Sequence, residues 1–220
     1  MGGNLALKYA GLYPEKVISV FTIESVGCYL WANDGNDGTD VIKGMKKLID
    51  AQIYYEENSE LMIGKSRRSH TWDQVLSKQI AGAKFFGSNL TEKEAKILLA
   101  RNATYDDKND TYRFNRDLKA NLVLTSCENR EFAEQILSRV EADICQVFCD
   151  NPPYYYAENG RASLSQGARK IYECMIEEQP KFLQKSSKSY EKVVVEGNHH
   201  VHLENPNNVL KVLIQFLDKF

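Results

Sequence analysis

The sequence contains no long apolar run and almost no excess of charge. None of its hydrophobic stretches approaches the roughly 18–20 residues that a membrane-spanning helix needs. Its formal net charge is −2, which gives no strong field toward nucleic acid or an anionic membrane surface. Met1 is followed by neither a basic patch nor an apolar segment, so we expect no signal peptide. These absences argue against a membrane span and against a nucleic-acid partner.

Cysteine is scarce, and its number is odd. The five cysteines are scattered along the chain, at positions 28, 127, 145, 149 and 174. An odd, scattered set is typical of reduced core thiols, so we expect the cytoplasm or another reducing intracellular compartment. Cys145 and Cys149 are four positions apart, but their segment has the pattern of a strand and no histidine lies near it. We therefore expect no metal site there.

What the chain does contain is enough material for a domain with a core. Its 220 residues are 43% hydrophobic and 26% charged, which is ordinary for a globular protein. Short apolar runs rich in β-branched residues predict buried strands, and segments of helical periodicity alternate with them. The predicted strands are 17–23, 144–149 and 190–195, and the predicted helices around them are 3–12, 132–140, 165–178 and the segment from 205 onward. This order predicts an α/β fold with a mostly parallel sheet.

Residues 38–104 have a different character. Apolar residues recur there at helical intervals in 39–65 and 72–86, and no convincing strand is present. Thr91 and Glu94 form a capping box that predicts the start of another helix. Only residues 112–114 indicate a brief extended piece. We therefore predict a partial α/β core formed by 1–24 and 121–220, with a mostly helical cap at 25–120.

The first residues, MGGNLALKYAGLYPEKV, have the pattern of a helix that follows a nucleophile elbow. The elbow motif is Gly-x-Ser-x-Gly on a turn from a strand to a helix. If Met1 and Gly2 are its last two positions, the serine is the residue before Met1. In an intact elbow the residue after the serine donates its backbone N–H to the oxyanion, which assigns that role to the nitrogen of Met1.

Three of the four histidines lie in one segment between the last predicted strand and the last helix. A catalytic histidine of a Ser–acid–His hydrolase occupies such a position. The pattern Gly-x-His followed by an acidic residue and proline favours His199 as the base, with His200 as the alternative. His202 is expected to pack at the start of the last helix. A metal-binding cluster and an ordinary loop are the competing interpretations.

Two carboxylates are candidates for the acid that orients this base. Asp150 follows the predicted strand 144–149 and is the first choice, although Asn151 and two prolines replace the usual Gly-x-x-Asp turn. Glu24 follows the strand 17–23 and is the alternative. Each could also be a solvated carboxylate at the end of a strand.

These residues together resemble the α/β-hydrolase superfamily, and within it the serine hydrolase-like proteins. The resemblance rests on residues 1–17, on 101–118 and on VEGNHHVHLENP at 195–206. It implies a mostly parallel sheet, a helical cap over the site, and hydrolysis of carboxylic esters or related bonds by a Ser–acid–His triad without a cofactor or metal. It assigns the base to His199 and the acid to Asp150, whereas the serine and the upstream strands have no counterpart in the chain.

The first interpretation is therefore an N-terminally truncated serine hydrolase that acts on a small ester-like molecule and is inactive as it stands. A non-enzymatic α/β-hydrolase-like binding or interaction protein is the alternative. A third possibility is an unrelated α/β domain whose histidines bind a metal or have no role. Nothing in the sequence indicates which acyl or alcohol group a substrate would carry, or the oligomeric state.

Overall fold

The computed structural model describes residues 2–25, 39–58, 68–85, 87–115, 130–151 and 179–220. The chain divides into two compact units. The first comprises Met1–Asp34 together with Glu128–Phe220, and the second comprises Gly35–Cys127.

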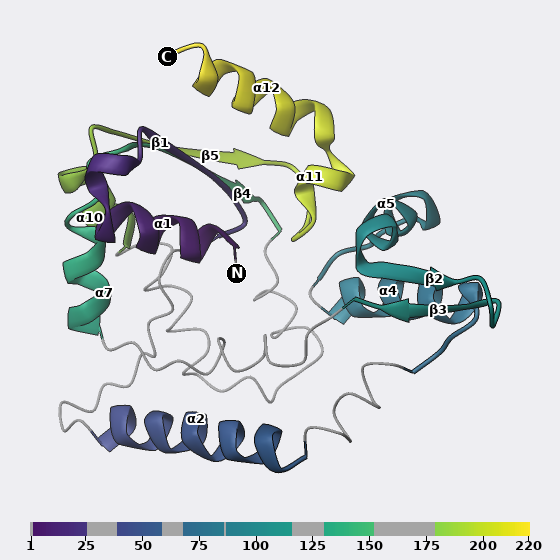
Figure 1. Ribbon diagram of the computed structural model, residues 1–220. Helices are drawn as coiled ribbons and strands as arrows, with labels where there is room; N and C mark the ends of the chain where they lie inside the picture. Colours follow the sequence, from purple (N-terminus) through teal and green to yellow (C-terminus); the bar gives the residue numbers. More distant parts are fainter. Residues whose placement is uncertain (1, 26–38, 59–67, 86, 116–129, 152–178) are drawn as a thin grey trace. The chain divides into compact units, whose positions relative to one another are not determined.

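The first unit is built on a sheet of three parallel strands in the order β1 (Ser19–Ile23), β4 (Asp143–Cys149), β5 (Ser189–Val195) (Figure 1). Every residue of β4 is buried, including Asp143 and Gln146, which explains why apolar residues lie on both of its faces rather than on one alone. Ile23 pairs with Val147, and Cys149 pairs with Val195. Because all three strands run the same way, the residues that follow them meet at one edge of the sheet.

Helices cover both faces of this sheet. On one face, α1 (Gly2–Leu12), α7 (Arg130–Leu137) and α10 (Gln179–Ser186) contribute to a buried apolar cluster. On the other face, α11 (Val201–Glu204) and α12 (Pro206–Leu217) contribute to a second cluster. In Figure 1, α1 and α12 lie on opposite sides of the strands. The first unit is therefore a three-layer α/β/α arrangement with β4 at its centre.

The sequence predicted most of this core. The predicted α/β class and parallel sheet are confirmed, and β1, β4, β5, α1, α7 and α12 each lie within a few residues of their predicted positions. A 3-10 turn, η1 (Pro14–Lys16), links α1 to β1. Helix α10 was not predicted. The helix predicted at 165–178 lies outside the described residues.

The second unit contains α2 (Thr39–Glu57), α4 (Trp72–Phe85), α5 (Glu92–Asn102) and an antiparallel hairpin of β2 (Ala103–Asp106) and β3 (Thr111–Phe114). The capping box that begins α5 is present as predicted. The brief extended piece at 112–114 is β3, but its partner β2 was not predicted. Strand β2 begins at the residue after α5, with no glycine or proline to mark the change. None of the described helices is long and apolar enough to cross a bilayer.

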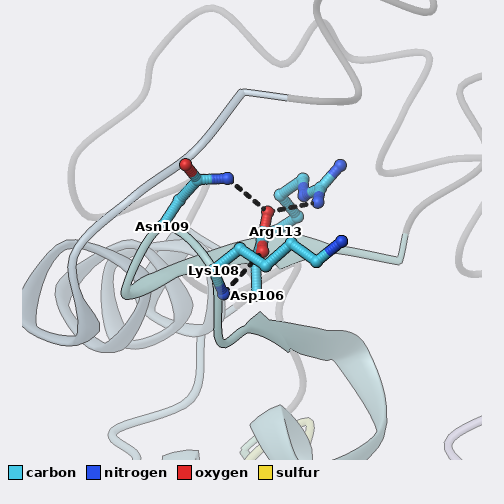
Figure 2. A network of polar contacts seen from close by, with 4 residues as sticks. All are labelled: Asp106, Lys108, Asn109 and Arg113. Atoms are coloured by element: carbon cyan, nitrogen blue, oxygen red, sulfur yellow. Dashed lines mark hydrogen bonds and ion pairs between the residues drawn. The ribbon is translucent and has the colours of Figure 1, made fainter.

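The turn of this hairpin is closed by one carboxylate. Asp106 accepts hydrogen bonds from the Asn109 side chain at 3.0 Å, the Arg113 guanidinium at 2.6 Å and the Lys108 backbone N–H at 3.3 Å (Figure 2). The bond from Asn109 and the positive charge of Arg113 hold the pKa of Asp106 below its ordinary value. Its contacts all come from within the hairpin, which marks it as a turn-stabilising group rather than a binding site.

The first two glycines of α1 provide a test of how closely this helix packs against the sheet. A Cβ placed on Gly3 would lie 2.3 Å from Cβ of Ser25, whereas a Cβ on Gly2 would meet no heavy atom within 4 Å. We expect Gly3→Ala to lower the free energy of unfolding by about 1–3 kcal/mol, because helix and strand must separate to admit the methyl group. Gly2→Ala should be neutral or stabilising by up to about 1 kcal/mol.

Urea unfolding followed by circular dichroism measures both variants. Equal stabilities for Gly3→Ala and Gly2→Ala would contradict the close packing of α1 on the segment after β1.

Candidate active site

Three chain segments meet at the carboxyl edge of the sheet. Glu24 follows β1, Asp150 and Asn151 follow β4, and residues 196–200 link β5 to α11. Backbone bonds join them, because Glu24 donates its N–H to Val147 O at 2.8 Å and Asp150 donates its N–H to Val195 O at 3.1 Å. The predicted base and both predicted acids therefore lie at this one edge.

The base predicted from sequence faces a buried carboxylate. Nδ1 of His199 lies 3.4 Å from Oε2 of Glu24. The Glu24 side chain is 5% exposed, whereas that of His199 is 34% exposed. A carboxylate at Nδ1 favours the tautomer that carries its proton there, in which Nε2 is the acceptor nitrogen of the ring. This pair has the chemistry of an oriented general base.

Glu24 has an uncommon backbone conformation, and its carboxylate is held by two contacts. Its φ is +48°, in the left-handed region that side chains other than glycine rarely adopt. Besides the contact with His199, its carboxylate accepts a hydrogen bond from the Cys149 backbone N–H at 2.5 Å. The carboxylate is thus held from the end of β4 on one side and meets the imidazole on the other.

Asp150, the first choice for the acid, has a different contact. It is exposed, and its Oδ1 accepts a hydrogen bond from the Gly197 backbone N–H at 2.9 Å. The structure therefore brings His199 to Glu24, the alternative acid, and joins Asp150 to the backbone of the loop that carries His199.

The other two histidines of the segment lie close to His199. The rings of His199 and His200 are 5.2 Å apart, and those of His200 and His202 are 5.9 Å apart. Burial, together with the neighbouring His199 and His202, lowers the pKa of His200 to about 4. Burial also lowers the pKa of His202. Within the described residues, no three histidine, cysteine, aspartate or glutamate side chains are grouped so as to hold a metal ion.

The two described cysteines are free thiols in the core. Burial and then the negative charge of Glu24 raise the pKa of Cys149, and burial raises that of Cys145 to about 11. Both therefore stay protonated at neutral pH and are poor nucleophiles. Cys28, Cys127 and Cys174 lie outside the described residues.

The start of α1 adjoins the same edge. Gly3 packs against Ser25, the residue after Glu24, closely enough that a side chain would not fit. Met1, predicted to supply an oxyanion donor, lies outside the described residues. The sequence reasoning did not identify two supporting groups, the Cys149 N–H and the Glu204 carboxylate. Only Glu204 had a signal, because it belongs to the motif that indicated His199.

Known proteins resemble this chain in sequence and in fold. No family model matches. The chain is 28% identical over 218 residues to the serine hydrolase-like protein of Danio rerio, and 24% identical over 224 residues to a Drosophila melanogaster protein named "Probable serine hydrolase". Each match covers 99% of this chain, but 58% and 57% of the two relatives. The chain thus spans somewhat more than half the length of these curated relatives.

Solved structures agree with this resemblance. A hypothetical protein of Pseudomonas aeruginosa PAO1 matches 99% of the chain with a TM-score of 0.64 at 15% identity, over 64% of its own length. The thioesterase domain from the curacin biosynthetic pathway matches 98% of the chain with a TM-score of 0.56 at 13% identity, over 63% of its own length. The chain has an α/β-hydrolase fold. An esterase of M. tuberculosis, with a TM-score of 0.54 and 14% identity, shares this fold over 59% of its length.

In this fold, the low pKa of His200 predicts a pH dependence of stability. The unfolded chain takes up a proton at this histidine below about pH 6.5, whereas the folded protein does so only near pH 4. The unfolded state therefore binds more protons between these values, and stability falls as the pH is lowered from 6.5 to 4. We expect His200→Gln to flatten this slope by less than about 1.4 kcal/mol per pH unit, because solvent reaches part of the ring.

Urea unfolding at a series of pH values through this window measures the slope. An unchanged slope in His200→Gln would show that this histidine is not kept neutral by the fold.

Proposed function

We propose that this chain supplies the base and the acid of a serine hydrolase triad that cleaves carboxylic esters or related bonds. His199 is the base and Glu24 the acid. The nucleophile is a serine immediately before Met1 in the intact protein. The observation that carries the proposal is the contact of Nδ1 of His199 with the buried Glu24 carboxylate. The names of the Danio rerio and Drosophila melanogaster relatives support the reaction class.

The geometry fits the roles that the acid and the base have in such a triad. Glu24 accepts a hydrogen bond from the Nδ1–H of His199, so that Nε2 is the nitrogen that takes the proton of the serine hydroxyl. As Nε2 becomes protonated, the buried carboxylate stabilises the imidazolium. The proton then passes from Nε2 to the leaving alcohol, and water attacks the acyl-enzyme with the same base. We also propose that residues 25–120 form the cap of this hydrolase.

The close approach of Gly3 to Ser25 supports the proposed place of the serine. It brings the start of α1 beside the segment that carries Glu24. A residue preceding Met1 would therefore enter the site from the same edge of the sheet. Without it the acid and base have no nucleophile to activate, so we propose that the chain beginning at Met1 is inactive.

The transcript sequence upstream of Met1 provides the first test. An in-frame Gly-x-Ser directly before Met1, preceded by strand-like sequence, is the expected result. An in-frame stop codon followed by a genuine start signal would overturn the proposed position of the serine.

The second test compares esterase activity in the chain beginning at Met1 and in the protein extended upstream. We expect turnover of a simple aryl acetate only in the extended protein, with loss of activity when the serine becomes alanine. Glu24→Gln and His199→Ala should each lower kcat by on the order of 10³- to 10⁴-fold, because the base loses its orientation or is removed. Asp150→Asn should change kcat less than about tenfold, because an amide oxygen can still accept from Gly197.

The reverse pattern, with Asp150→Asn inactive and Glu24→Gln active, would assign the acid to Asp150. A folded extended protein without turnover or labelling by a fluorophosphonate would favour the alternative of a non-enzymatic binding protein. Turnover by the chain beginning at Met1 that disappears in His199→Ala would contradict the proposed need for the upstream serine.

A further inference from the structure

The segment that carries His199 is neither helix nor strand. Strand β5 ends at Val195 and α11 begins at Val201, so the base lies on a linker of five residues. General-base catalysis requires the imidazole to hold one orientation toward both the acid and the nucleophile. Bonds other than those within the helices and strands must therefore fix the backbone of this linker.

Side chains on both sides of the linker bind its backbone. Asp150 accepts from the Gly197 N–H at 2.9 Å, and Glu204 accepts from the Asn198 N–H at 2.6 Å through Oε2. Asn205 donates from its side chain to Glu196 O at 3.0 Å. The two carboxylate contacts are charge-assisted and are stronger than bonds between neutral groups.

Of these three side chains, Glu204 binds the linker residue that directly precedes His199. Its partner, the N–H of Asn198, belongs to the peptide unit that joins Gly197 to Asn198, the residue before His199. Glu204 lies beside Gly197, whose φ is +147° and where an added Cβ would lie 3.4 Å from Oε2 of Glu204 and 3.0 Å from Cγ2 of Val201. A side chain at position 197 would therefore strain the backbone and crowd Val201 at the start of α11.

The other oxygen of the Glu204 carboxylate is buried in a way that costs free energy of folding. Oε1 of Glu204 is shielded from solvent and has no hydrogen-bond partner in the described part of the chain. An unsatisfied buried polar atom disfavours folding. An apolar residue in this place would avoid that penalty, so the carboxylate is present in spite of it. Its bond to Asn198 is the contact that can offset it.

We infer that Glu204 is a positioning residue for His199. Its carboxylate, held on α11, fixes the Asn198 peptide and thereby the direction in which the imidazole leaves the backbone toward Glu24. The inference rests on the proposed function for its effect on catalysis, but its effect on the orientation of the ring is a property of the chain beginning at Met1. Asp150 holds the preceding peptide in the same way from the end of β4.

The first test reads the ring of His199 directly in this chain. Two-bond ¹H–¹⁵N correlation spectra at about pH 8, above the ordinary pKa of histidine, distinguish which ring nitrogen carries the proton. The unsubstituted chain should hold the proton on Nδ1. In Glu204→Ala the Nδ1–H fraction should fall at least about twofold, because a released ring samples both tautomers.

A conservative pair separates the hydrogen bond from the negative charge. Glu204→Gln keeps an oxygen that can accept from Asn198 and should resemble the unsubstituted chain. Glu204→Asp keeps the charge but is shorter by one methylene, and should resemble Glu204→Ala. The matched control is Glu196→Ala, which removes an exposed carboxylate from the same linker and should leave the spectrum unchanged.

Activity in the upstream-extended protein provides the second readout. Glu204→Ala and Glu204→Asp should lower kcat by about 10- to 100-fold, the size of effect that a small misplacement of a reacting group produces. KM should change less than about threefold, because Glu204 acts through His199 and not on the substrate. Glu204→Gln should retain kcat within about threefold of the unsubstituted protein.

These measurements separate failure of the inference from failure of the proposed function. Folded Glu204→Asp with the spectrum of the unsubstituted chain would overturn the positioning role, as would Glu204→Gln with the spectrum expected of a released ring. If Glu204→Ala does not fold, the Asp and Gln pair still decides the question. If no extended form has activity, the hydrolase proposal fails, while the spectra still establish or overturn the role of Glu204.

Discussion

The parallel pairing of β4 with both β1 and β5 is the constraint on which the candidate site depends. Three strands running the same way bring their carboxyl ends to one edge, so residues more than a hundred positions apart become neighbours. Residues at the end of β4 then form hydrogen bonds with the chain segments on both sides of that strand. Cys149 donates its N–H to the Glu24 carboxylate, and Asp150 accepts from Gly197. A shift of one residue in register would direct the Cys149 N–H to the opposite side of the strand and break this connection.

Because Glu24 is buried, its carboxylate needs partners such as His199 to replace the water that it loses. A carboxylate that is 95% shielded from solvent loses hydration that only hydrogen bonds and an opposite charge can replace. The Cys149 N–H supplies one partner, and the His199 ring supplies the other. The left-handed backbone of Glu24 adds strain of the order of 1 kcal/mol, and this conformation is held by the bond from its own N–H to Val147. The proposed acid is thus held by contacts other than its contact with the proposed base.

The sequence predicted the elements that depend on local pattern. Short, mostly apolar runs rich in β-branched residues indicated the buried strands, and the Gly-x-His motif between strand and helix indicated His199. It favoured Asp150 over Glu24 as the acid, but it held no information on their contacts, because both are carboxylates one residue beyond a core strand. What separates them is a backbone φ of +48° at Glu24 and the position of the Gly197 N–H beside Asp150, and both arise from tertiary packing. Strand β2 was missed for a similar reason, since it depends on its partner β3 more than on its own residues.

Asp150 and Glu24 show how two similar carboxylates acquire different tasks at one edge of a sheet. Glu24 faces inward, where a low dielectric environment strengthens its attraction for a protonated imidazole. Asp150 faces solvent, where a charge contributes less to electrostatic stabilisation but can still accept a directed bond from a backbone N–H. The described contacts of the two carboxylates come from β4 and from the linker that carries His199. In the proposed hydrolase, the acid and base would therefore draw their geometry from the sheet itself, and a nucleophile delivered at the start of α1 would meet a base that is already oriented.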